Sequence, residues 1–116
     1  MDISFKNTKL GKEFNEGKRL ENVHGSLRAK KIRLRMAEFR AATCLYDFWP
    51  PKSGNNRCHE LTQGERKGQL SVDLDHPFRL IFVSNHNPVP KKSDGGLDWK
   101  QVTAITIIGI EDTHEQ

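Results

Sequence analysis

Two segments in the first half of the chain repeat their apolar residues at the period of an α-helix. The stretch that starts at Asn7 and Thr8 carries three such residues around a natural stop at Gly17: Leu10, Phe14 and Leu20. It predicts a short helix. Residues 26–48 contain no Gly or Pro and predict a second, long helix, which Pro50 ends because proline has no backbone donor. One apolar stripe of this helix is Ile32, Met36, Phe39 and Tyr46. The opposite stripe is Leu34, Ala41, Leu45 and Phe48, so we expect cover on both sides, from the first helix and the sheet or, on one side, from a partner protein.

The second half of the chain alternates apolar and polar residues at period 2, which is typical of strands. Four segments show it: 57–61, 69–74, 78–83 and 102–110. A short alternating piece at 3–5 predicts an earlier strand, and residues 86–100 read as a mobile loop. Turn residues between the strands favour an antiparallel meander. The pattern predicts an α+β fold in a single domain, 1–116, with two N-terminal helices, one of them long, packed on a mainly antiparallel sheet of four to five strands.

The chain of 116 residues has a net charge of +4 and a sequence pI of about 9.2, and its basic residues are concentrated in the first half. Residues 1–67 hold 15 Lys and Arg against 8 Asp and Glu, whereas residues 68–116 hold 4 against 7. This asymmetry favours a polyanionic partner such as nucleic acid, although a basic surface can also serve solubility alone. The sequence shows no membrane-length apolar stretch and no leader-like start, and its thiols are expected to be reduced, so we expect a cytoplasmic protein.

Several residues that suit acid–base or phosphate chemistry fall on the predicted strands. Arg57 and His59 share one strand face, and Arg79 interrupts an apolar row with Ile81 and Val83. By parity, two residues at the end of the last strand, Asp112 and His114, continue the row of Ala104, Thr106, Ile108 and Ile110. Non-functional interpretations stay open. His59 can be a half-exposed surface histidine, Arg79 can form an ion pair with Asp73, and the C-terminal end can be frayed.

These side chains suit cleavage of RNA through its own 2′-hydroxyl group. That reaction needs a base, an acid and fixed cations, and histidine and arginine provide them without a metal ion. The Cys and His spacings do not predict a zinc site, and no cofactor is expected. The segment 64–68 predicts a glycine turn with a basic tip, Arg66 and Lys67, which together with the long basic helix would contact RNA.

The order of these motifs resembles the RelE/ParE superfamily of bacterial toxins, and most closely its HigB branch, the plasmid maintenance killer proteins. The matching segments are 57–61, 64–68, 69–72, 78–82 and 110–114, and the resemblance covers nearly the whole chain. It implies a RelE-like fold and a type II toxin that cleaves mRNA on the ribosome and inhibits translation. It also implies a helix-turn-helix antitoxin, similar to HigA, through which alone the toxin meets operator DNA; no membrane partner is expected.

Residue by residue, the resemblance implies a catalytic set and a phosphate-binding set. His59, Asp112 and His114 would serve proton transfer or substrate placement, and Arg79 would stabilise the reacting phosphate. Arg57, Arg66 and Lys67 would bind RNA. Thr113 stands where the family has a tyrosine that stacks on a base. The alternatives are a non-catalytic toxin that acts on DNA gyrase, as in the ParE branch, and an RNA-binding protein with reduced activity.

Overall fold

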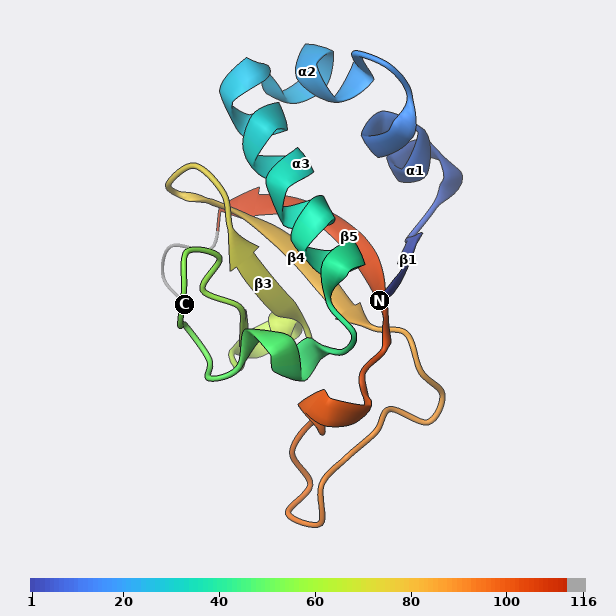
Figure 1. Ribbon diagram of the computed structural model, residues 1–116, viewed down its shortest axis with the longest axis vertical. Coiled ribbons are helices and arrows are strands. Elements are labelled where there is room, and N and C mark those ends of the chain that lie inside the picture. Colours follow the sequence, from blue (N-terminus) through green and yellow to red (C-terminus); the bar gives the residue numbers. More distant parts are fainter. Residues whose placement is uncertain (113–116) are drawn as a thin grey trace.

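The computed structural model describes residues 1–112, in which helices and one sheet form an α+β fold (Figure 1). The helices are α1 (Thr8–Asn15), α2 (Arg19–His24) and α3 (Ser26–Ala41). The strands are β1 (Asp2–Phe5), β2 (His59–Glu60), β3 (Leu70–Asp73), β4 (Phe78–Ser84) and β5 (Ala104–Asp112). Short 3-10 helices interrupt the connections: η1 (Leu45–Phe48), η2 (Gly64–Arg66) and η3 (Trp99–Gln101).

The strands form one sheet in the order β1-β5-β4-β3-β2. Strand β1 runs parallel to β5, and the other neighbours are antiparallel. The strands β2 to β5 therefore follow one another across the sheet in chain order. This arrangement confirms the mainly antiparallel α+β sheet that the alternation predicts.

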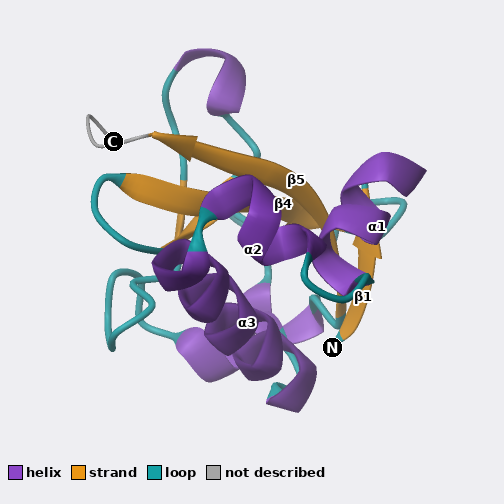
Figure 2. Cartoon of the chain, turned by 90° about the horizontal axis from the view of Figure 1, so that it is seen from above, coloured by secondary structure: helices purple, strands orange, loops and turns teal. Residues whose placement is uncertain are grey.

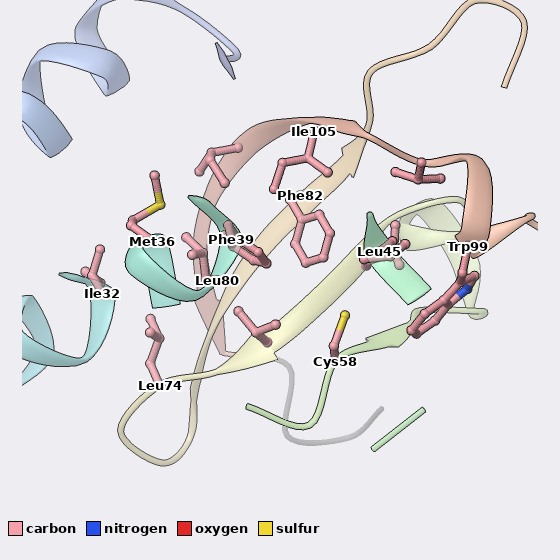
Figure 3. Close-up of a cluster of buried hydrophobic side chains, with 14 of the residues drawn as sticks. Ile32, Met36, Phe39, Leu45, Cys58, Leu74, Leu80, Phe82, Trp99 and Ile105 are labelled. Carbon is pink, nitrogen blue, oxygen red and sulfur yellow. The ribbon is translucent and has the colours of Figure 1, made fainter. Parts of the chain in front are cut away.

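One face of the sheet packs against the helices and carries the hydrophobic core (Figure 2). We call it the helix face and the opposite one the far face. Alternate residues of β3 and β4 point into this core: Leu70, Val72, Leu80 and Phe82. Phe39 of α3 meets Phe82 edge to face, with 4.9 Å between ring centroids (Figure 3). The intervening residues, among them Arg79 and Ile81, must then lie on the far face.

The helical region differs from the prediction in two ways. A third helix, α2, lies between Gly17 and Gly25 and was not predicted, since six residues are too few for a clear period. The long helix ends at Ala41 instead of Phe48, because Leu45 donates its N–H to Val102 O at 2.9 Å and thereby leaves the helical path. The helices of the described chain are all too short or too polar to cross a membrane.

Within the described chain, only one of the two apolar stripes of α3 is covered. Residues of the first stripe, Ile32, Met36 and Phe39, are buried, whereas Leu34 of the second stripe keeps 49% of its surface exposed. The loop after β4 also departs from the prediction. It forms a bridge between Lys91 and Leu97 and then places Trp99, at the start of η3, in the core with 2% of its surface exposed (Figure 3).

Candidate functional site

The far face of the sheet carries two rows of side chains across β2 to β5. Direct partners in an antiparallel pair point to the same side, so the register defines each row. The first row is His59, Ser71, Ile81 and Gly109, and the second is Asp73, Arg79 and Glu111. Polar and titratable groups from four strands thus gather on one surface. His59 and Arg79, which lie 20 positions apart in the sequence, belong to adjacent rows.

His59 is the most distinctive member of this surface. Its side chain is buried, with 4% of the residue exposed, which excludes the half-exposed interpretation. Nδ1 lies 2.7 Å from Arg57 O. Because a carbonyl oxygen only accepts, Nδ1 carries the proton, and in the neutral ring Nε2 keeps its lone pair. Nε2 is buried and finds no hydrogen-bonding partner among residues 1–112. His59 also lines a pocket of about 420 Å³, together with residues such as Pro51, Lys52 and Gln63.

The surroundings of His59 keep its imidazole neutral. Burial lowers its pKa, and the positive charges of Arg79 and Lys52 lower the pKa further. The hydrogen bond to Arg57 O and the carboxylate of Asp73 act in the opposite direction, but the net shift is downward. A neutral, buried imidazole with a free lone pair at the edge of a pocket has the properties of a general base.

Two arginines meet on the carboxylate of Asp73. Arg79 Nε lies 3.2 Å from Oδ1, and Arg57 Nε lies 3.3 Å from Oδ2. The ion pair between Arg79 and Asp73, one of the two interpretations left open by the sequence, is therefore present. Arg57 precedes β2 with a left-handed backbone, φ 50°, which is uncommon for a residue other than glycine. The carboxylate holds both guanidinium groups on the far face, where a phosphate would compete for them.

Arg35 of α3 supports this arrangement from the helix side. It is one of the basic residues of the first half of the chain, but only 4% of the residue is exposed. Its guanidinium donates to Asp73 O at 2.7 Å and to Asn55 O at 3.1 Å, and it pairs with Glu38. Arg35 thereby ties the loop before β2 to β3, the two segments that carry Arg57 and Asp73. A helical period alone does not identify such a residue, since its partners are backbone carbonyls.

The two basic residues of the 64–68 turn, Arg66 and Lys67, lie in different surroundings. Arg66 reaches Glu111 with two hydrogen bonds of 2.6 and 3.1 Å, and Glu111 raises the pKa of this guanidinium. Arg66 therefore belongs to the far-face surface, as one more cation held by a carboxylate. Lys67 lines a neighbouring hollow with Val89 and Leu97, which shares part of its lining with the pocket of His59.

The last strand brings Glu111, rather than Asp112, to the far face. A bulge at Ile108 shifts the register between Ile81 and Phe82, and Gly109 accommodates it with φ 156°. Beyond the bulge Asp112 lies opposite Phe78, on the helix face. The predicted row from Ala104 to Asp112 is therefore wrong, because parity assumes an unbroken strand. His114 lies outside the described residues.

Two further polar residues of the far face were not predicted, Ser71 and Glu111. Ser71 is fully buried opposite His59, and its hydroxyl has no hydrogen-bonding partner within residues 1–112. The alternation in 69–74 marks Ser71 as the partner of a strand position, and the glycine inside the last strand is a known signal for a bulge. Both signals were available.

The remaining polar and thiol groups do not extend the site. Within the described part of the chain, no three His, Cys, Asp or Glu side chains gather as a possible metal site. Cys58 is buried, and burial raises the pKa of its thiol, which disfavours the nucleophilic thiolate. In comparisons with known proteins, neither a family model, nor a curated protein, nor a solved structure matches this chain.

Proposed function

We propose that this protein is the toxin of a type II toxin–antitoxin pair and an endoribonuclease that cleaves mRNA on the ribosome. The observation that supports this most is the surroundings of His59: the residue lines a pocket, its Nε2 is buried and unpartnered within residues 1–112, and two arginines that share one carboxylate lie on the same face. A base and fixed cations on one surface are what cleavage through the 2′-hydroxyl requires. A RelE-like fold belongs to the same proposal.

In the proposed reaction, His59 Nε2 takes the proton of the 2′-hydroxyl group. The 2′ oxygen attacks the adjacent phosphorus, the bond from phosphorus to the 5′ oxygen breaks, and the 5′ oxygen receives a proton. The products are a 2′,3′-cyclic phosphate and a 5′-hydroxyl end. Arg57 and Arg79 stabilise the charge that builds on the phosphoryl oxygens, after exchanging Asp73 for the phosphate. His114 remains our proposed donor to the 5′ oxygen, and the helix-face position of Asp112 removes it from the proposed set.

The ribosome and a helix-turn-helix antitoxin are the proposed partners. The basic excess of residues 1–67 supports contact with ribosomal RNA, since clustered Lys and Arg gain from the release of condensed counterions. Exposed α3 residues such as Arg33 and Arg40 contribute to this surface. An antitoxin that covers the far face would remove RNA from His59 and stop the toxin.

The test is induction in bacterial cells, followed by mapping of transcript 5′ ends and by measurement of growth. We expect growth arrest and new 5′ ends within translated codons. His59→Gln and Arg79→Gln should remove both effects, whereas the matched changes His24→Gln and Arg19→Gln, on α2, should leave them in place.

Growth arrest with DNA damage and intact messages would instead support action on gyrase. Binding to ribosomes without new 5′ ends would support an RNA-binding protein that lacks cleavage. Full toxicity and unchanged cleavage in both His59→Gln and Arg79→Gln would remove the proposed mechanism.

A further inference from the structure

Another concave surface lies where η1 meets η3, and three aromatic rings line it. This hollow has a volume of about 390 Å³. Tyr46 and Trp49 stack with 5.5 Å between ring centroids and 17° between ring planes. Trp99 meets Trp49 edge to face at 5.1 Å. Trp99 is buried, but Tyr46 and Trp49 keep 39% and 44% of their surface exposed. Because the stacked rings cover one face of each other, the pair offers a planar ligand an outer ring face and the ring edges.

Two lysines border the same hollow. Lys100 Nζ lies 4.8 Å from the centre of the Tyr46 ring, and Lys92 lies in the lining. Two carboxylates lie beside these lysines: Asp94 pairs with Lys92 at 3.5 Å, and Asp98 accepts from the Lys100 backbone N–H at 3.2 Å. Aromatic rings flanked by ammonium groups match a nucleotide, whose base is planar and whose phosphate is anionic.

The hollow is joined to the pocket of His59 through the chain and through one hydrogen bond. Trp49 is followed directly by Pro50, Pro51 and Lys52, and the last two of these line the His59 pocket. On the other side, Trp99 Nε1 donates to Glu60 Oε2 at 3.3 Å, and Glu60 also lines that pocket. Three extended residues span roughly 10 Å at most, so one strand of RNA can reach both surfaces.

We propose that this aromatic–lysine hollow binds an unpaired nucleotide of single-stranded RNA beside the cleavage site. The base stacks on the outer face of the Tyr46–Trp49 pair, and Lys92 and Lys100 contact the neighbouring phosphates. The choice of RNA as the occupant rests on the proposed function. Binding here positions the strand, so that the scissile phosphate meets His59 and the arginines. Thr113 cannot stack on a base, and the hollow supplies aromatic surface elsewhere in the chain.

The test measures binding of a fluorescein-labelled single-stranded RNA of about ten nucleotides by fluorescence anisotropy. The full chain carries His59→Gln throughout, so that the RNA stays intact. Trp49→Ala and Tyr46→Ala should each weaken binding about tenfold, as expected for the loss of a stacked base. Trp49→Phe should retain most of the affinity. Lys100→Gln should reduce the slope of log K against log salt by about 0.7, because one phosphate contact is lost.

Leu34→Ala is the matched control, since Leu34 is an exposed apolar residue of α3 outside the hollow. It should not change the affinity. Equal affinity of the parent, Trp49→Ala and Tyr46→Ala, with all three folded by circular dichroism, would overturn the proposal. The proposal would also fail if a partner protein, but not RNA, shielded Trp49 from an added fluorescence quencher. If cleavage in cells survives Trp49→Ala and Tyr46→Ala, this inference is wrong but the proposed nuclease stands. If RNA binding depends on Trp49 but no cleavage occurs in cells, the proposed nuclease is wrong but this inference stands.

Discussion

The two faces of the sheet are built from the same strands but follow different rules. On the helix face, residues such as Leu80 and Phe82 pack against Phe39 of α3, and the surface is apolar throughout the core. On the far face, the register places His59 and Arg79 equally well, yet His59 Nε2 is buried without a partner among residues 1–112, and Arg79 shares a carboxylate with Arg57. Burial of apolar groups stabilises a fold, whereas burial of polar groups without partners costs free energy. This difference is the basis on which we place the proposed site on the far face.

The largest effect is expected for the helix face. Phe39→Ala removes a fully enclosed ring that contacts Phe82 and Phe48, so it should lower the free energy of unfolding by about 4 kcal/mol. Leu34→Ala, on the same helix but exposed, should cost less than about 0.5 kcal/mol. Denaturant unfolding measures both. Similar losses for the two variants would break the division between core and surface on α3.

A smaller loss of stability is expected when Arg35 is changed, because this side chain joins α3 to β3 and to the loop before β2. Arg35→Met keeps the length of the side chain but leaves the carbonyls of Asp73 and Asn55 without their donor. We expect a loss of about 3 kcal/mol and weaker RNA binding, because the segment that carries Arg57 loosens. Arg40→Met, at an exposed position of α3, is the control for stability. An unchanged midpoint in urea for Arg35→Met would contradict the supporting role.

The pH dependence of stability distinguishes His59 from a surface histidine. Its pKa in the folded state lies below the roughly 6.5 of an unfolded histidine, so the unfolded chain binds more protons in the window below that value. The contribution of neutral His59 is therefore complete above about pH 6.5 and is lost as the pH falls toward the folded pKa. Between pH 7.5 and pH 5, the free energy of unfolding of the wild type should therefore fall more than that of His59→Gln. Parallel curves, or a difference of opposite sign, would refute the assigned environment.

The smallest effect on stability is expected for two carboxylates on opposite faces of the sheet, Asp73 and Asp112. Asp73→Asn releases Arg57 and Arg79 for phosphate, so it should tighten binding of single-stranded RNA by about fivefold to tenfold and steepen the salt dependence. Stability should change by no more than about 1 kcal/mol, since these pairs are partly exposed. Asp112→Asn makes the same change of charge on the helix face and should alter binding much less. Equal effects of the two would mean that only net charge matters.

Local patterns in the sequence predicted most of the sheet and part of the site. The alternation in 78–83 correctly separates Phe78, Leu80 and Phe82 from Arg79, because side-chain direction in a regular strand depends only on parity. Parity fails in β5, where the bulge at Ile108 exchanges Asp112 for Glu111 on the far face. The glycine next to it was a usable signal.

Other features depend on contacts between distant segments and have no local signal. The end of α3 at Ala41 depends on a hydrogen bond from Leu45 to Val102, 57 positions further along the chain. The burial of Arg35 depends on carbonyls of Asn55 and Asp73, and the burial of Trp99 depends on how the loop after β4 folds back. Periodicity reports one element at a time and does not contain these contacts.

The most direct test of the role of His59 uses purified protein, ribosomes and an mRNA with a single 2′-deoxy nucleotide at the mapped cleavage position. We predict that wild type cuts the all-ribose message to leave a 2′,3′-cyclic phosphate and a 5′-hydroxyl end, and that either the 2′-deoxy substitution or His59→Gln abolishes the cut. Cleavage of the 2′-deoxy message, or cleavage by His59→Gln at the rate of wild type, would contradict proton transfer from the 2′-hydroxyl to His59.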